Sequence, residues 1–277
     1  MFTDSHCHLT FAELASDLSA VLAAMQAARV TRALCISTSM EEFGRVQALA
    51  AAHGNLWATA GVHPDNEGGR EPSVQELVQA CAQSKVVAIG ETGLDYYMMQ
   101  QRKGGRSIAE LEWQRERFRA HIRAARLARV PLVIHMRAAC EDTLAILREE
   151  GEDGSPGSVG GVFHCFTETP TVARAALALG FHISLSGIVT FKNAADVHEV
   201  ARLVPEERLL IETDSPYLAP VPYRGKVNSP AYVPYVAARI AELRGVPIER
   251  VAEFTGVNFT RLFLRGVTHE DVQGDVE

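Results

Sequence analysis

Eight short apolar runs recur along this chain, and a stretch with helical periodicity follows almost every one. Most of the runs are apolar throughout rather than alternating, which is typical of parallel strands buried on both faces. We expect strands at 1–6, 32–37, 56–63, 86–92, 130–136, 162–166, 182–187 and 209–214. We expect helices at 11–29, 41–53, 74–84, 108–129, 141–150, 171–179, 194–203, 231–243 and 248–263. This alternation predicts an α/β fold, the (β/α)8 or TIM barrel.

A single domain accounts for the whole predicted barrel. The chain has 277 residues and is 47% hydrophobic, which is ample for a sizeable core. Barrels of this kind commonly need about 250 residues. The expected loops at 66–72, 97–107 and 151–160 are too short to be domain linkers, and a proline-rich stretch at 215–230 follows the eighth strand. We therefore expect one barrel domain over 1–267, followed by a polar tail over 268–277.

Charge and cysteine usage restrict the partners and the compartment. The net charge of −7 excludes a globally basic nucleic-acid binder, so any contact with nucleic acid must be local. The five cysteines are odd in number and contain no CxxC pair, so free thiols in a reducing cytoplasm are expected. No apolar run reaches the roughly 20 residues of a membrane span. We expect a cytoplasmic monomer without membrane contact.

Titratable residues stand at the carboxyl ends of the expected strands. In a TIM barrel these ends converge on one face, where active sites are built. His63 stands at the carboxyl end of the third expected strand. The other residues at these ends are His6, His8, Glu91, His135, His164 and Asp214.

Each of these residues also has an ordinary interpretation. His6 and His8 fit a hydrogen-bonded surface pair, Glu91 a helix cap, and Asp214 a turn cap. Two histidines that follow apolar runs, His135 and His164, fit satisfied core residues. Together, however, four histidines and two carboxylates in one place cost several kcal/mol unless a cation compensates them.

Imidazole and carboxylate groups are the ligands of Zn²⁺, Mn²⁺ and Mg²⁺. Six ligands exceed one tetrahedral site, so we expect two divalent ions. A two-ion site needs a bridging group, and no lysine stands at a strand carboxyl end. Glu91 is therefore the expected bridge.

Several longer motifs resemble one known family, the TatD family of metal-dependent deoxyribonucleases among the amidohydrolase-type barrels. The resemblance covers nearly the whole chain, and the motifs at 90–97 and 212–233 are the most specific. The matching motifs are DSHCHL at 4–9, GVHP at 61–64, GETGLDYY at 90–97, IHMR at 134–137, FHCF at 163–166, LSGIVTFKNA at 185–194, ETDSPYLAPVPYRGKVNSPAYV at 212–233 and NFTRLF at 258–263.

The resemblance implies a ligand scheme and an activity. Glu91 would be shared between two ions, and Asp214 would serve the first. The histidine ligands would be His6 and His8 for the first ion, and His135 and His164 for the second. The implied reaction is phosphodiester hydrolysis, typically 3′-to-5′ trimming of single-stranded DNA with Mg²⁺, with Zn²⁺ or Mn²⁺ as alternatives.

The chain departs from the family pattern at the mouth of the barrel. Asp65 follows GVHP where the family often has a second histidine. Met136 and Ala138 replace a serine and an aspartate, and Thr167-Glu168 follow FHCF. These positions bear on substrate preference rather than on metal binding.

A mechanism follows as a hypothesis. Glu91 and Asp214 are the expected catalytic residues, and Asp214 would take the proton of a metal-activated water. Basic residues at 100–106 would follow a nucleic-acid backbone, although a solvated loop is the ordinary interpretation. Packing, turn, salt-bridge or surface roles remain open for the expected substrate contacts, which are His63, Arg137, Tyr96 and Arg224, with Tyr97, Tyr223 and Lys226 as further candidates.

Other functions remain open on these residues. The same ligands suit hydrolysis of a carboxylic ester, a lactone or an aminoacyl ester, including a misacylated tRNA. A non-enzymatic metal-binding barrel would not need the whole set. A redox role of Cys7 or Cys165 is disfavoured because alternation turns both thiols away from the histidines. Asp4 is expected to orient a ligand imidazole from behind.

Overall fold

The computed structural model describes residues 1–97 and 107–265. Its eight strands pair in parallel in chain order. Backbone hydrogen bonds from Asp214 N to the His6 oxygen (2.9 Å) and from His8 N to the Ser215 oxygen (2.8 Å) join the segment after the last strand to the first. The predicted TIM barrel is confirmed. The strands are β1 (Phe2–Cys7), β2 (Val30–Cys35), β3 (Leu56–Ala60), β4 (Val86–Asp95), β5 (Leu132–Arg137), β6 (Gly161–Phe163), β7 (His182–Leu185) and β8 (Leu209–Ile211).

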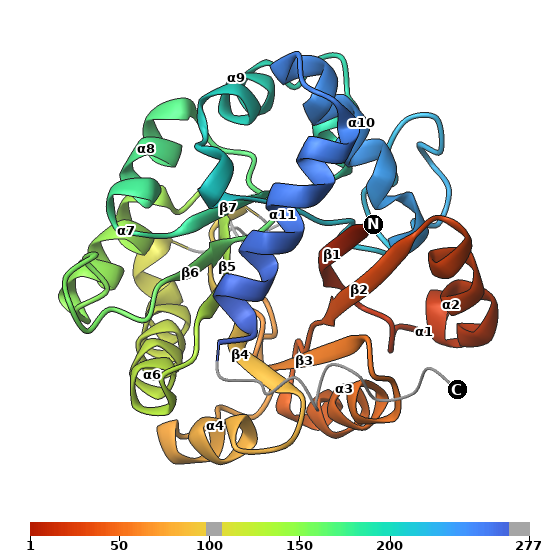
Figure 1. The fold of residues 1–277 in the computed structure, drawn as a ribbon. Helices are drawn as coiled ribbons and strands as arrows, with labels where there is room; N and C mark the ends of the chain where they lie inside the picture. Colours follow the sequence, from red (N-terminus) through yellow and green to blue (C-terminus); the bar gives the residue numbers. More distant parts are fainter. Residues whose placement is uncertain (98–106, 266–277) are drawn as a thin grey trace.

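Helices surround the strands in Figure 1. The expected helix at 11–29 is two helices, because Asp17 caps the second by accepting a hydrogen bond from the Ala20 amide. The expected helix at 108–129 begins with a 3₁₀ turn. The α-helices are α1 (Ala12–Ala15), α2 (Leu18–Ala27), α3 (Met40–Ala52), α4 (Val74–Cys81), α6 (Glu112–Ala128), α7 (Cys140–Glu149), α8 (Pro170–Ala178), α9 (Ala195–Leu203), α10 (Val233–Arg244) and α11 (Ile248–Phe263), and the 3₁₀ helices are η1 (Ile108–Leu111), η2 (Gly187–Thr190), η3 (Glu206–Arg208) and η4 (Pro230–Tyr232).

Local sequence signals set the ends of these helices. Ser73 and Glu76 form a capping box at the start of α4, in which each side chain binds the other's backbone amide. Thr169 caps α8, whose first residue is Pro170, a residue suited to the first helical turn. Gly245 ends α10 with a φ of 66°, a left-handed conformation that glycine adopts without a steric cost.

The last helix covers the end of the barrel where the strands begin, and Figure 1 shows it running across them. Asn258 of α11 donates to the Leu209 oxygen at the start of β8 (2.8 Å). The Phe259 ring lies 5.9 Å from the ring of Trp57, near the start of β3. Because α11 covers this end, the carboxyl ends of the strands face the opposite opening, which is the one available for a site.

Several strands end at other residues than expected, and three of these differences bear on the site. β3 ends at Ala60, so His63 lies in the following turn, and β8 ends at Ile211, so Asp214 lies beyond it. β4 continues to Asp95, with a register irregularity between Ile89 and Thr92. Glu91 lies inside this irregularity, where the pleat of β4 is interrupted.

Two of the expected features lie outside the described residues, namely the basic loop at 100–106 and the tail at 268–277. All five cysteines are described and free. Among the described helices, none combines the length and the apolar character that crossing a membrane requires.

Candidate metal centre

A first group of donor atoms lies where β1 and β8 end. The Nε2 atoms of His6 and His8 are 3.3 Å apart. Asp214 Oδ1 lies 3.6 Å from His6 Nε2 and 3.3 Å from His8 Nε2. Glu91 Oε2 lies 3.5 Å from His6 Nε2. Two imidazoles and two carboxylates, from the ends of β1 and β8 and from within β4, therefore converge on one point.

A second group of donor atoms surrounds the other oxygen of the same glutamate. Glu91 Oε1 lies 2.8 Å from His164 Nε2 and 3.3 Å from His135 Nδ1. His63 Nε2 also lies 3.3 Å from this oxygen. The structure thus places His63 within the donor set, whereas the sequence pointed to it as a substrate contact. Each oxygen of Glu91 faces a different group of imidazoles.

Burial and mutual charge shift the titration of these residues. Burial alone would raise the pKa of Glu91, but the charges of His164, His63 and His6 hold its pKa well below the usual range. Burial opposes protonation of His63, yet Glu91 and Asp65 raise its pKa to about 10. The cluster therefore favours ionised carboxylates and draws cationic groups toward them.

These residues fit divalent cations. The facing atoms are imidazole nitrogens and carboxylate oxygens, which are the donors that Zn²⁺, Mn²⁺ and Mg²⁺ accept. Glu91 is almost fully buried, and a buried carboxylate among imidazoles is most stable when a cation neutralises it. His6, His8 and Asp214, with Glu91 beside them, would hold one cation. Glu91, His63 and His135, with His164 beside them, would hold a cation on the other side.

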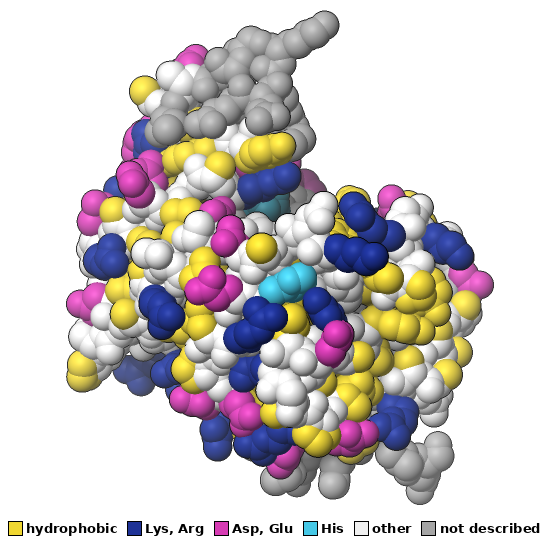
Figure 2. All heavy atoms as spheres, turned by 90° about the horizontal axis from the view of Figure 1, so that it is seen from above, with side chains coloured by type: hydrophobic (Ala, Val, Ile, Leu, Met, Phe, Trp, Pro, Cys, Tyr) yellow, Lys and Arg dark blue, Asp and Glu magenta, His cyan; other side chains and the backbone are white. Residues whose placement is uncertain are grey.

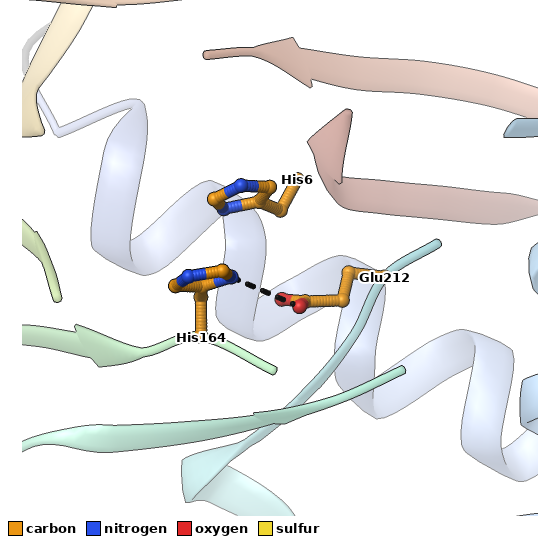
Figure 3. Close-up of side chains that lie close together, drawn as sticks. All are labelled: His6, His164 and Glu212. Carbon is orange, nitrogen blue, oxygen red and sulfur yellow. Dashed lines mark hydrogen bonds and ion pairs between the residues drawn. The ribbon is translucent and has the colours of Figure 1, made fainter. Parts of the chain in front are cut away.

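A carboxylate stands behind each imidazole of the second group. Asp65 Oδ1 lies 2.7 Å from His63 Nδ1, and Asp95 Oδ2 lies 3.1 Å from His135 Nε2. Figure 3 shows the third pair, in which Glu212 Oε1 lies 3.3 Å from His164 Nδ1. Such a partner fixes the tautomer and the orientation of a ligand imidazole. By contrast, the Nδ1 atoms of His6 and His8 have no hydrogen-bond partner among the described residues.

Sequence reasoning did not assign these backing carboxylates, although signals for two of them were present. Asp95 is four residues after Glu91, and Glu212 is two residues before Asp214, so strand alternation places each on the same face as a ligand. Asp65 gave no periodic signal because it lies in a turn. Figure 3 also shows that the ring of His6 stacks on that of His164, with centroids 3.8 Å apart.

The expected role of Asp4 behind a ligand imidazole is wrong. Its carboxylate accepts hydrogen bonds from the amide of His6 (3.2 Å) and from the amide of Thr213 (2.9 Å). The Thr213 hydroxyl also donates to it. Asp4 therefore ties the end of β1 to the backbone after β8 and touches no imidazole ring. Cys7 lies in the hydrophobic core, as alternation along β1 predicts.

Helix α6 holds the turn that carries His63. The amide of Val62 donates to Nε2 of buried His121 (3.0 Å), and the His121 Nδ1 bonds the Arg117 oxygen (2.8 Å). The Arg117 guanidinium donates to the His63 oxygen (2.7 Å). Burial lowers the pKa of His121 to about 4, so this imidazole is neutral and can accept the Val62 bond.

The expected substrate contacts differ in their accessibility. Arg137 is exposed, with its guanidinium 4.1 Å above the ring of Tyr97. Arg224 is exposed over Phe191 at 4.3 Å. The expectation for Tyr96 is contradicted, because this side chain is 2% exposed and its hydroxyl donates to Asp142 (2.6 Å). Tyr96 anchors the end of β4 to α7 and cannot reach a substrate.

The face of the molecule drawn in Figure 2, which is a side of the barrel, is mixed in charge. Lys or Arg side chains and Asp or Glu side chains are interspersed over it without a continuous basic area. This agrees with the net charge of −7 and with the expectation that any contact with nucleic acid is local.

Comparison with known proteins agrees with this geometry. The model of the family described as TatD related DNase matches residues 3–264. The chain is 45% identical over 94% of both chains to an uncharacterized metal-dependent hydrolase, YcfH, of Escherichia coli K12. It is 34% identical to a protein of Escherichia fergusonii named 3′-5′ ssDNA/RNA exonuclease TatD, over 94% of this chain and 98% of the relative.

A solved structure supports the same assignment. The TatD homolog YjjV of Escherichia coli K12 superposes with a TM-score of 0.85 at 29% identity. The superposition covers 95% of this chain and 98% of that one. Fold, donor set and sequence therefore agree that the chain belongs to the TatD-related family of metal-dependent hydrolases.

Proposed function

We propose that this protein removes nucleotides from the 3′ end of single-stranded nucleic acid, with DNA as the main substrate, using two divalent ions. The observation that carries the proposal is the position of Glu91, whose two oxygens face two separate groups of imidazoles. A shared carboxylate is what a two-ion site for in-line displacement at phosphorus requires. The name of the relative from Escherichia fergusonii supports the substrate class.

The side chains of the site have different roles in the proposed reaction. Bound divalent ions would lower the pKa of water and polarise a phosphoryl oxygen, with Mg²⁺ as the expected activator and Zn²⁺ or Mn²⁺ as alternatives. Asp214 takes the proton of the attacking water, because it is partly open to the mouth, with 14% of its side chain exposed. Burial opposes ionisation of Asp214, but His8 and His6 lower its pKa, so the base is ionised. Glu91 holds the two groups of donors together.

Pairs of cationic and aromatic side chains would hold the strand. Arg137 lies over Tyr97, and Arg224 lies over Phe191. A guanidinium offers two parallel hydrogen bonds to a phosphate, and an exposed ring offers a face on which a base can stack. These contacts are local, as the overall negative charge requires.

The test is a nuclease assay with oligonucleotides labelled at the 3′ or the 5′ end, as DNA and as RNA, in Mg²⁺, Mn²⁺ or Zn²⁺. We expect early release of the 3′ label and a ladder of shortened 5′-labelled products. Glu91→Gln should lower kcat/KM by more than about 100-fold, beyond the usual effect of losing an outer partner of a metal ligand. Glu116→Gln, on the exposed face of α6, is the matched control.

A parallel panel of an aryl ester, a lactone and an aminoacyl-tRNA separates this proposal from ester hydrolysis. If the parent protein hydrolysed one of these compounds but left oligonucleotides intact, and Glu91→Gln abolished that hydrolysis, the substrate class would be wrong. Full nuclease activity in Glu91→Gln would refute the bridging role.

A further inference from the structure

A recess of about 800 Å³ lies at the end of the barrel where the strands begin, opposite the candidate metal centre. It is bounded by the starts of β4, β5 and β7, by the loop at 154–161 and by the end of α11. Val87, Leu262 and Phe263 form part of its apolar lining. A volume between about 300 and 1,000 Å³ is typical of small-molecule sites.

Positive charge gathers around this recess. Arg126, Arg129, Arg208 and Arg265 line it, and no carboxylate does among the residues that the structure describes. Arg126 is neutralised by Glu152 at 2.6 Å. Within the described ranges, the other three have no Asp or Glu partner at ion-pair distance. A chain of net charge −7 thus places three uncompensated guanidinium groups around one recess.

A buried imidazole lies among these charges. His182, at the start of β7, is 6% exposed, and its Nδ1 atom has no hydrogen-bond partner in the described part of the chain. Burial, and then the positive charge of Arg208, lowers the pKa of His182 to about 4, and Arg265 acts in the same direction. Two arginines from distant segments therefore act on one neutral imidazole at the wall of the recess.

We propose that this recess binds the phosphate of a small molecule of mononucleotide size. Arg129, Arg208 and Arg265 hold the phosphate, because guanidinium forks match its oxygens in bidentate hydrogen bonds. The apolar lining contacts the rest of the molecule. A nucleic-acid strand instead needs an open groove that follows its backbone, whereas α11 and the loop at 154–161 bound this recess. The inference does not depend on the proposed activity, since the metal centre is at the other opening.

Isothermal titration of the full chain, with Mg²⁺ present, tests the inference with three probes: inorganic phosphate, adenosine 5′-monophosphate and adenosine. The test variant combines Arg129→Asn with Arg208→Gln. Asparagine tolerates the left-handed backbone at position 129, where φ is 58°, and glutamine keeps much of the side-chain stem of residue 208. Arg45→Gln, on α3, is the matched control because its side chain is 71% exposed.

We expect the monophosphate to bind in a 1:1 ratio and adenosine to bind at least tenfold more weakly. The double variant should weaken monophosphate binding at least tenfold, while Arg45→Gln leaves it unchanged. His8→Ala, which damages the metal centre, should retain this binding. The inference is overturned if the double variant binds as tightly as the parent, or if His8→Ala abolishes binding. It is also overturned if phosphate binds only after removal of residues 266–277, because the recess would then receive the chain's own acidic end.

Discussion

Replacing the carboxylate behind His135 should weaken metal binding without disturbing the fold. In Asp95→Asn the new side chain has the same shape, and its carbonyl can still accept the Tyr97 amide bond that Asp95 Oδ1 accepts at 3.0 Å. The other end of Asp95 faces His135 Nε2 at 3.1 Å. A carboxylate there can only accept, so it keeps the proton on Nε2 and leaves Nδ1 free to face Glu91 and an ion. An amide NH₂ in that place favours the opposite tautomer.

The structure sets the size of the effect. The Asp95 side chain is 3% exposed and that of His135 is 17% exposed, so water screens their contact little. A hydrogen bond to a charged group contributes about 1.5–3 kcal/mol. Loss of such a partner behind a metal ligand typically costs about 10–100-fold in affinity, which is about 1.4–2.8 kcal/mol. The two estimates agree, and we expect a loss within this range.

Titration of the apoprotein with Mn²⁺ by calorimetry, supported by the visible absorption of bound Co²⁺, measures the change. Asp142→Asn is the matched control, because Asp142 accepts a hydrogen bond from Tyr96 nearby but contacts no ligand imidazole. If two binding events are resolved, the loss should fall mainly on one of them, since His6 and His8 have no backing carboxylate among the described residues. Unchanged Mn²⁺ affinity in Asp95→Asn, or an equal loss in Asp142→Asn, would refute the reasoning.

Three further predictions concern stability. The pKa of His121 is lowered to about 4 in the folded chain, so unfolding takes up a proton between pH 6.5 and pH 4. The free energy of unfolding, measured with urea, should therefore fall by about 3 kcal/mol as the pH falls through this range. His121→Gln should remove this part of the pH dependence. If the free energy of unfolding fell equally with pH in the parent and in His121→Gln, the neutral state of buried His121 would be contradicted. Chelation with EDTA should lower the free energy of unfolding by about 2.7 kcal/mol relative to protein with ion at 100 times Kd, and thermal scans that do not respond to ions would contradict the site. In Gly93→Ala the new Cβ would lie 2.0 Å from the backbone oxygen of His135, at a φ of 128°. The free energy of unfolding should therefore fall by about 2–4 kcal/mol. A variant as stable as the parent would contradict the close approach of β4 and β5.

The sequence predicted the architecture because its signals are local and repeat eight times. Continuous apolar runs mark parallel strands, and capping residues such as Ser73 and Thr169 mark helix starts. The barrel rule then places strand ends together, which is why residue order alone groups His6, His8 and Glu91 at one opening. The expected ends at His63 and Asp214 were displaced, because a ladder of hydrogen bonds, rather than side-chain character, ends a strand.

Tertiary structure alone decided how the donor atoms divide between the two oxygens of Glu91. Glu91 lies within a register irregularity of β4, and no periodicity in the sequence reveals that irregularity. The same holds for Asp65, a turn residue that stands behind His63, and for Tyr96, which packing buries against α7. Residue types and strand alternation thus determined which titratable side chains gather at the mouth of this barrel. The distances between side chains far apart in the sequence, which depend on packing across the whole barrel, decided which group serves as ligand, partner or anchor.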